Sequence, residues 1–199
     1  MRVIGIYGAV GSGKSTLLEE LKASIPNCYV IPEYIDALDD AENKLKEYLD
    51  GSMSAYDFQQ YVLDYFEMVA DELKNSYYDF VFVERLPVEG IQFFAKLDLT
   101  NKRITNEQYK ALLKRAQSLT FYPNPTIEPS ITIKTDLLSP FQISQLALNY
   151  LRTHRIIKLK ASLETIKERI VRRGRSCEIE HYTEDYLKFM IETYDTNQK

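Results

Sequence analysis

The sequence has little cysteine, no long apolar run and no excess of positive charge. Only two cysteines, Cys28 and Cys177, occur in 199 residues, far apart and without the spacing of a metal site. We therefore expect packing or loop thiols in a reducing compartment such as the cytoplasm. No apolar run reaches membrane-spanning length, and a net charge of −4 gives no electrostatic case for binding nucleic acid or an anionic membrane.

The composition is that of a globular protein, with 45% hydrophobic and 27% charged residues. Its length predicts a single domain over residues 1–199. A strand pattern begins almost at Met1, so we expect no signal or transit peptide. The least regular stretch is 121–129, where three prolines oppose both a helix and a central strand.

The most informative segment runs from Gly8 to Ser15 and matches G-x-x-x-x-G-K-[ST], the phosphate-binding P-loop. A strand pattern precedes it and a helix pattern follows it, as this loop requires. Its glycines allow backbone N–H groups to point at phosphate oxygens, and the helix adds the positive end of its dipole. A glycine-rich turn that binds nothing is therefore the weaker interpretation. The predicted nucleotide-binding residues are Gly8, Ala9, Val10, Gly11, Ser12, Gly13, Lys14, Ser15 and Thr16.

Strand and helix patterns alternate along the chain. Strands are expected at 3–7, 28–31, 79–85, 130–134 and 155–160. Helices are expected at 15–24, 39–49, 54–74, 88–96, 106–119, 141–151, from 162 onward, and at 183–194. This alternation predicts an α/β fold with a parallel sheet of about five strands and helices on both faces.

Charged residues follow two of the predicted strands. Glu33 comes after the second strand, and Glu84 and Arg85 end the third. The carboxyl ends of parallel strands face the ligand crevice, so these side chains are expected near the P-loop. A solvated loop carboxylate and a structural ion pair are the alternatives.

Four arginines lie within the seven residues 169–175, in an otherwise acidic protein. Their mutual repulsion favours an anionic partner, and guanidinium groups match phosphate oxygens. A solvated basic helix end is the alternative, but the P-loop makes phosphate binding the better interpretation.

Together these segments resemble the deoxyribonucleoside kinase family, which includes enzymes similar to thymidine kinase 2, deoxycytidine kinase and deoxyguanosine kinase. Pro32-Glu33 resembles the family's acidic motif, and Phe58-Gln59-Gln60-Tyr61-Val62 its F-Q-x-Y-V helix. Glu84-Arg85-Leu86 resembles its E-R-S motif. Residues 169–178 match R-I-x-x-R-x-R-x-x-E, the lid over the donor phosphates, which would span about 169–181. The resemblance implies a P-loop kinase fold with this arginine-rich lid.

The resemblance also implies the reaction: ATP-dependent phosphorylation of the 5′-hydroxyl of a deoxyribonucleoside, for nucleotide salvage. Glu33 would be the general base, and Arg85 would orient Glu33 and the 5′-oxygen. Ser15 and Glu84 would hold Mg²⁺. The cations expected on the donor side are Lys14, Arg173 and Arg175 at the transferring phosphoryl group, and Arg169 near the donor base and phosphates.

The substrate side is implied in the same way. Gln59 would read the base with two hydrogen bonds, and Phe94 would stack on it. Tyr48 and Glu178 would bind the 3′-hydroxyl. Taken singly, Tyr48 and Phe94 would be core or surface aromatics.

Two positions favour a pyrimidine substrate, and thymidine in particular. Deoxycytidine kinase-like members carry charged residues where this chain has Gly90 and Phe66. An apolar, roomier pocket near Val62 would accept a 5-methyl group. Gln59 alone cannot separate thymine from cytosine, because an amide can present its donor and acceptor either way round.

The chain also departs from the family pattern. Leu86 replaces the serine of E-R-S and would remove a hydroxyl near the site, and Leu38 falls where many members have a pocket tryptophan. Family members usually have a final strand after the lid, and we expect none in this sequence. We expect 156–160 to be the strand that leads into the lid, while 130–134 supplies a fifth strand by another route, or none.

Three other functions stay open. A thymidylate kinase-type monophosphate kinase shares the P-loop and lid but typically has Asp-Arg in place of Glu84-Arg85. A GTP-binding switch would need N-K-x-D, and neither Asn-Lys pair of this chain is followed by a suitable Asp. A nucleotide-binding regulator with little turnover is favoured by Leu86 and the missing tryptophan. A homodimer is usual in the family, and helix 54–74 would provide an interface if its aromatics are not buried as core.

Overall fold

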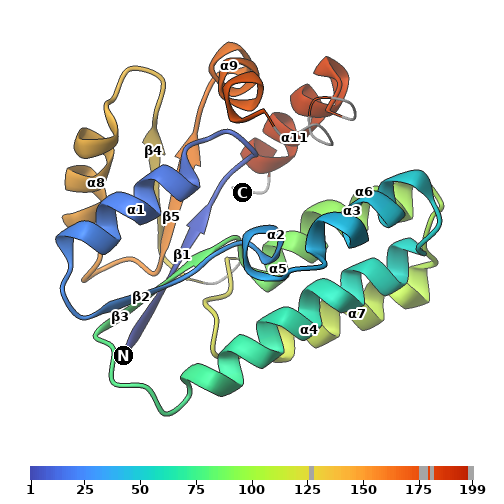
Figure 1. Cartoon of the computed structure of the whole chain (residues 1–199), viewed down its shortest axis with the longest axis horizontal. Helices are drawn as coiled ribbons and strands as arrows, with labels where there is room; N and C mark the ends of the chain where they lie inside the picture. Colours follow the sequence, from blue (N-terminus) through green and yellow to red (C-terminus); the bar gives the residue numbers. More distant parts are fainter. Residues whose placement is uncertain (126–127, 175–178, 180–181, 197–199) are drawn as a thin grey trace.

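The computed structural model describes residues 1–125, 128–174, 179 and 182–196. A five-stranded sheet lies at its centre (Figure 1). The strands are β1 (Arg2–Tyr7), β2 (Cys28–Ile31), β3 (Phe80–Glu84), β4 (Ser130–Lys134) and β5 (Ile156–Lys160). Their order is β2-β3-β1-β5-β4, and each neighbouring pair is parallel. The predicted α/β fold with a parallel sheet of about five strands is confirmed.

The last two strands, β4 and β5, lie in the sheet in the reverse of their order in the sequence. β5 pairs with β1 on one side and with β4 on the other, so that β4 forms the edge of the sheet. Helix α9 (Leu163–Arg173), which carries the first of the clustered arginines, follows β5 directly. This agrees with the expectation that 156–160 leads into the lid and that 130–134 is the fifth strand.

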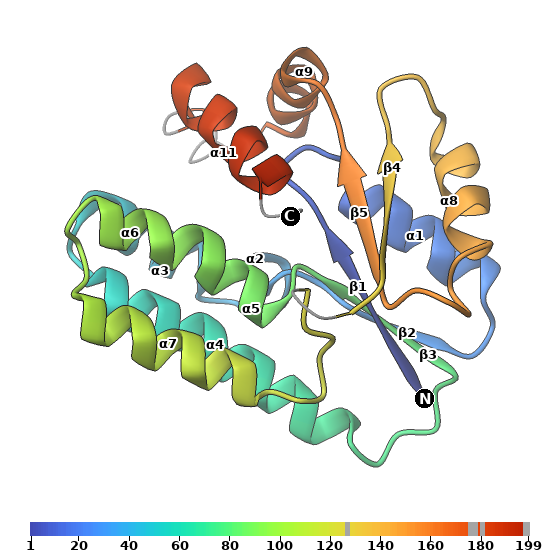
Figure 2. The same ribbon diagram turned by 180° about the vertical axis from the view of Figure 1, so that it is seen from behind.

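Helices cover both faces of the sheet, because side chains alternate along each strand. Ile4 and Ile6 of β1 pack under α1 (Lys14–Ser24) and α8 (Pro140–Leu148). Val3 and Tyr7 face the other way, toward α4 (Ala55–Leu73) and α11 (Glu184–Thr196). In Figures 1 and 2, α9 and α11 lie together at the carboxyl end of β1 and β5.

The aromatic stripe of α4 belongs to the core of a single chain. Phe58, Tyr65 and Phe66 are buried together with the aliphatic residues of the same helix face. Of the two interpretations offered for these aromatics, the structure supports core packing over a dimer interface.

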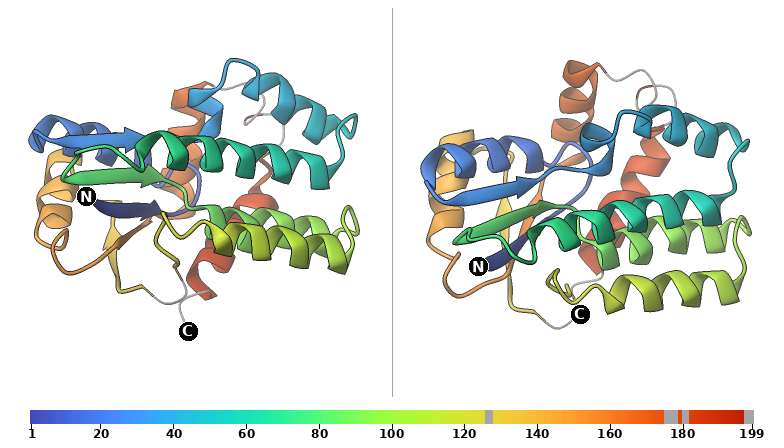
Figure 3. Two further views of the ribbon diagram at one scale, coloured as in Figure 1. Left: turned by 90° about the horizontal axis from the view of Figure 1, so that it is seen from below. Right: turned by 60° about the horizontal axis from the view of Figure 1, so that its bottom comes forward.

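A group of helices extends beyond the sheet: α3 (Ala41–Asp50), α4, α5 (Pro87–Gly90), α6 (Lys96–Thr100) and α7 (Asn106–Ser118). Figure 3 shows α4 and α7 running side by side, and they pack around a separate cluster that includes Leu63 and Leu112. Hydroxyl side chains cap five of the described helices by accepting a backbone N–H bond. None of the described helices is both long and apolar enough to span a membrane.

Two local features differ from the sequence-based expectation. The single helix expected at 88–96 is instead α5, a π-helical turn η1 (Ile91–Ala95) and α6. The short helix α2 (Tyr34–Ala37), directly after Glu33, was not predicted. A four-residue turn is too short for hydrophobic periodicity to reveal, and a π-turn differs from an α-turn by one residue per hydrogen-bonded ring.

Candidate active site

The predicted P-loop connects β1 to α1. Gly8 has a φ of 151°, and a Cβ there would lie 2.6 Å from the Leu159 carbonyl oxygen, so only glycine fits. Lys14 is 4% exposed, and its Nζ donates to the Ala9 carbonyl oxygen at 3.2 Å. Burial lowers the pKa of Lys14, and the nearby Arg85 adds to this shift. The ammonium group is therefore folded back onto its own loop, beside the place where phosphates would bind.

A hydroxyl and a carboxylate meet at the first turn of α1. Ser15 Oγ donates to Glu84 Oε1 at 3.0 Å, and Lys14 Nζ lies 4.0 Å from the same oxygen. Burial raises the pKa of Glu84, and Lys14 opposes that shift. These oxygens fit Mg²⁺, which takes one or two protein oxygens and completes its shell with phosphate and water. The described residues hold no cluster of three or more His, Cys, Asp or Glu side chains that could bind a metal ion.

Glu33 and Arg85 also meet, as predicted from their positions at strand ends. Arg85 Nε donates to Glu33 Oε1 at 2.7 Å. Arg85 Nη1 donates to the Tyr194 hydroxyl at 2.9 Å, and that hydroxyl donates to Glu89 Oε1 at 2.8 Å. Arg85 has a φ of 64°, which is unfavourable for a residue with a Cβ. The structure thus holds Arg85 in an unfavourable backbone conformation, with hydrogen bonds from its side chain to two others.

A second polar cluster joins α3, α4 and α6. Asp98 is 1% exposed, and its Oδ1 accepts a hydrogen bond from the Tyr48 hydroxyl at 2.9 Å. Gln59 Nε2 donates to Asp98 Oδ2 at 3.4 Å, and Arg103 Nη1 lies 3.5 Å from Asp98 Oδ1. Burial raises the pKa of Asp98, while the Tyr48 hydrogen bond opposes the shift. The structure thus brings Tyr48 and Gln59 together through an acid that the sequence patterns did not indicate.

The other predicted substrate residues differ in their surroundings and in how deeply they are buried. The Arg85 guanidinium carbon lies 4.9 Å from the centroid of the half-buried Phe94 ring. A Cβ added at Gly90 would meet nothing within 4 Å. Val62 is half-buried against the core. Phe66 is buried in that core, with its ring centroid 5.2 Å from that of Tyr122.

Leu86 does not line the site as expected for the residue that replaces the serine of E-R-S. Its side chain is fully buried, and its carbons would lie 2.6 to 2.8 Å from a Cβ built on Gly5. Leu86 therefore fills the space above Gly5 of β1, inside the core. The loss of a hydroxyl near the reacting groups stays a prediction.

The lid helix contacts the P-loop through Arg169. Arg169 Nη1 donates to the Gly11 carbonyl oxygen at 3.0 Å and to Thr135 Oγ1 at 3.2 Å. Thr135 Oγ1 in turn lies 3.0 Å from the Ser12 carbonyl oxygen, to which it donates. Thr135 was missed, although it directly follows the predicted strand 130–134 and could have been found by the strand-end rule that identified Glu33. Arg175 and Glu178 lie outside the described residues.

A cleft of about 1050 Å³ opens between the P-loop, α1 and α9. Arg169, Arg172 and Arg173 line one side. The other side includes Lys14, Ser15 and Glu84. The hydroxyl of Ser12 is buried and makes no hydrogen bond within the described residues. Cations, loop N–H groups and an unsatisfied hydroxyl around a space of this size suit a nucleoside triphosphate.

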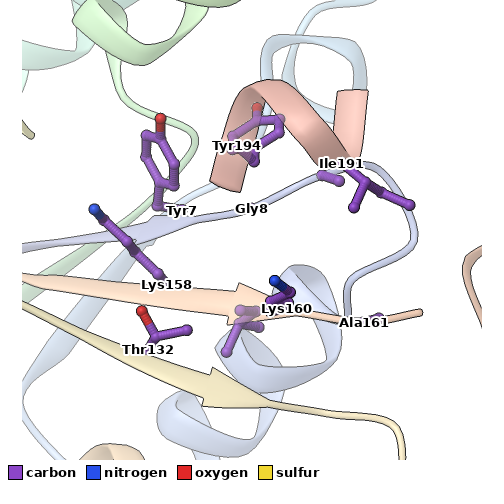
Figure 4. A pocket seen from close by; sticks show the side chains of 10 residues that line it. Tyr7, Gly8, Thr132, Lys158, Lys160, Ala161, Ile191 and Tyr194 are labelled. Atoms are coloured by element: carbon purple, nitrogen blue, oxygen red, sulfur yellow. The ribbon is translucent and has the colours of Figure 1, made fainter. Parts of the chain in front are cut away.

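A smaller cavity lies behind the P-loop, between β5 and α11 (Figure 4). Lys158, Thr132 and Tyr194 line it, and its volume of about 20 Å³ is close to that of one water. Lys158 Nζ lies 5.5 Å from the Tyr7 ring centroid, and burial lowers its pKa. This cavity is too small for a nucleotide.

Comparisons with known proteins agree with this geometry. The family model for deoxynucleoside kinases matches residues 4–137. Among solved structures, deoxyadenosine kinase from M. mycoides with bound dATP is similar, with a TM-score of 0.64 and 20% identity over 98% of this chain and 83% of that chain. A structure of the same enzyme with the products dCMP and a flexible dCDP has a TM-score of 0.60 and 19% identity, over 98% and 82% of the two chains. No curated protein sequence matches the chain. At such identities the two structures show a shared fold.

Proposed function

Because the chain belongs to the deoxynucleoside kinase family, we propose that it transfers the γ-phosphoryl group of ATP to the 5′-hydroxyl of a deoxyribonucleoside. As a member of that family it is a phosphotransferase. The proposed acceptor is a pyrimidine deoxynucleoside, with thymidine preferred, and the proposed role is nucleotide salvage. The open space at Gly90 and the apolar surroundings of Val62 support this choice.

The observation that carries the proposal is the hydrogen bond between Glu33 and Arg85, at the carboxyl ends of β2 and β3 and beside the P-loop. A sugar hydroxyl is a weak nucleophile, so a carboxylate must accept its proton during transfer. Glu33 is the proposed base. Arg85 orients it through Nε, and its Nη2, which makes no hydrogen bond within the described residues, is directed to the 5′-oxygen.

In the proposed reaction the 5′-oxygen forms a bond to the γ-phosphorus while the bond from that phosphorus to the β-phosphate oxygen breaks. The proton of the hydroxyl goes to Glu33, and ADP leaves. Lys14 and Arg173 neutralise the transferring group from the P-loop and the lid, together with Arg175. Mg²⁺, bound by Ser15 and Glu84, would screen the phosphate charge. Arg169 holds the lid helix against the P-loop through Gly11.

The test is ADP release with ATP and Mg²⁺ against thymidine, deoxycytidine, deoxyadenosine, deoxyguanosine and thymidine monophosphate. We expect turnover of deoxynucleosides, and a loss of at least about 100-fold in kcat for Glu33→Gln, because a positioned general base contributes about that much or more. Glu72→Gln, which changes an exposed carboxylate on α4, is the matched control and should retain full activity.

The other outcomes separate the alternative functions. Turnover of the monophosphate alone would move the protein to the thymidylate kinase class. ATP binding without any turnover would support a nucleotide-binding regulator. The side chain of Leu86, one of the two features that favour that alternative, is packed in the core over Gly5.

We propose further that residues 1–199 act as one catalytic domain, in a homodimer in the cytoplasm and without a nucleic-acid partner. This rests on the family resemblance and on the acidic composition. Light scattering after gel filtration would measure the mass of the assembly. A monomer at micromolar concentration would contradict the dimer.

A further inference from the structure

We propose that Asp98 fixes the orientation of the Gln59 side-chain amide and thereby determines which class of nucleobase the enzyme accepts. This inference rests on the proposed function, in which Gln59 reads the base. Asp98 would act through Gln59, as a positioning residue, and would not itself contact the reacting atoms.

The contacts of Asp98 come from three different parts of the chain. Oδ2 faces Gln59 Nε2 of α4 at 3.4 Å. Oδ1 accepts from the Tyr48 hydroxyl of α3 at 2.9 Å and lies 3.5 Å from Arg103 Nη1, in the segment between α6 and α7. The Arg103 guanidinium also lies over the Tyr48 ring, 4.2 Å from its centroid. Asp98 is therefore held in place independently of Gln59, which allows it to direct the amide.

An ionised carboxylate accepts hydrogen bonds and donates none. The amide nitrogen of Gln59 must face Asp98, because the opposite orientation would place the amide oxygen against a buried carboxylate oxygen. A buried acceptor left in that arrangement has no hydrogen-bond donor and is unfavourable. Burial raises the pKa of Asp98, and the hydrogen bond from Tyr48 and the charge of Arg103 oppose that shift. The constraint on Gln59 holds while the carboxylate is ionised.

Nucleobases fall into two classes at the edge that such an amide reads. Cytosine and adenine present an amino donor beside a ring-nitrogen acceptor. Uracil and thymine present a carbonyl acceptor beside an N–H donor. A freely rotating amide serves both classes by turning over, whereas an amide that cannot turn over pairs fully with one class and leaves the other unsatisfied. Gln59 is therefore selective because of Asp98, whichever class it favours.

Deoxyuridine and deoxycytidine test this directly in the wild-type enzyme, because their bases differ only at this edge. We expect the values of kcat/KM for the two nucleosides to differ by at least about 30-fold, as for a site whose polar groups are left unpaired by the wrong substrate. A difference of less than about threefold would overturn the inference, since that is the behaviour of a rotating amide.

Asp98→Asn tests the cause of the selectivity. An asparagine can donate or accept, so Gln59 becomes free to turn over, and the ratio between the two nucleosides should fall at least about tenfold. Asp71→Asn is the matched control: it makes the same change at an exposed carboxylate of α4 that has no contact with Gln59, so the ratio should be retained. A merely structural role of Asp98 would lower both kcat/KM values by the same factor and leave the ratio unchanged, which would overturn the inference. Thermal unfolding identifies a variant that fails to fold. In that case the inference is tested by the ratio of kcat/KM for deoxyuridine and deoxycytidine in the wild-type enzyme.

The outcomes also separate this inference from the proposed function. Strong selectivity for deoxycytidine that is lost in Asp98→Asn would refute the thymidine preference and support the positioning role of Asp98. An enzyme that phosphorylates no deoxynucleoside would refute both.

Discussion

Arg85 is the residue on which the proposed chemistry depends most directly. It adopts a left-handed backbone conformation and makes hydrogen bonds to Glu33 and Tyr194 through two different nitrogens. An unfavourable backbone conformation persists only where surrounding contacts over-determine it. Here those contacts aim a planar cation at Glu33, the proposed general base.

Arg85→Lys tests this geometry. A lysine keeps the charge, but a single ammonium group cannot reproduce the fork that bonds to Glu33 and Tyr194 at once. We expect kcat to fall at least about 100-fold, as for the loss of a group that stabilises the transition state, while the KM for ATP changes little. Steady-state kinetics measure both values. Arg152→Lys, at an exposed position, should retain full activity.

Leu86→Ser would restore the hydroxyl of the family motif, but we expect it to fail as an activating change. The leucine side chain is fully buried over Gly5, and its loss leaves a cavity. The free energy of unfolding should fall by about 2 to 5 kcal/mol, the range for large-to-small changes in a core. Urea denaturation measures this effect. Leu86→Met, which conserves volume, should lose less than about 1.5 kcal/mol. A stable and more active serine variant would show that Leu86 acts on the site itself.

The buried Glu89 predicts a pH dependence with a defined sign. Burial raises the pKa of its carboxyl group, and Arg85 opposes the shift. As pH rises, the unfolded chain therefore releases this proton before the folded chain does. The stabilisation due to Glu89 is full below the ordinary carboxyl pKa of about 4.3 and is lost as the pH rises through the folded-state value.

Glu89→Gln should lack this loss of stabilisation. The free energy of unfolding, variant minus wild type, should therefore increase from about pH 4 to about pH 8. Urea denaturation at several pH values gives this difference directly. A difference that is constant or falls with pH would contradict the raised pKa of Glu89.

The residues that sequence patterns identified are those with a fixed place in a motif or at a strand end. Lys14, Glu33 and Arg85 were found in this way, and the structure brings them together. Asp98 was not found, because no motif contains it and its role depends on three helical segments meeting around it. Such a cluster depends on tertiary packing, which the spacing of residues along one helix does not encode.

At the scale of elements, α11 completes the site from the far end of the chain. Tyr194 lies between Arg85 and Glu89, and its ring stacks on Phe93 with centroids 5.0 Å apart. The Tyr194 hydroxyl therefore connects α11 to Arg85, the residue after β3.

Tyr194→Phe removes only this hydroxyl and keeps the ring packing. We expect kcat to fall about tenfold with an unchanged KM for ATP, since one hydrogen bond to a charged group is lost, worth about 1.5 to 3 kcal/mol. Tyr150→Phe, at the end of α8, is a control on the other side of the sheet. If Tyr194→Phe lowers the melting temperature but leaves kcat unchanged, α11 has a structural role only.

Element boundaries were predictable where periodicity was long and poorly predictable where it was short. The prediction of a helix at 54–74 from its apolar spacing nearly matches α4. The π-turn η1 was missed, although it carries both Phe93 and Phe94. One extra residue in that turn places Phe93 against Tyr194 and Phe94 against Arg85. A pattern averaged over a whole helix cannot show a local change of this kind.

For the whole molecule, alternating strands and helices were sufficient to predict a parallel sheet with two covered faces. The order of the strands in the sheet was not fully predictable, because the sequence pattern of a strand does not show which strands will pair with it. The assignment of 156–160 as the strand leading into the lid reduced the number of possible strand orders. The structure agrees with this assignment, because α9 directly follows β5.

This strand order has a consequence for how the chain is made. During synthesis β4 emerges before β5, yet β5 is its partner in the sheet. Until residues 156–160 have left the ribosome, β4 has nothing to pair with, and β1 lacks a neighbour on that side. The sheet would therefore be completed late, when β5 inserts between β1 and β4. Ribosome-stalled chains that end before residue 156 should be cut readily by proteases. The released protein should resist the same proteases.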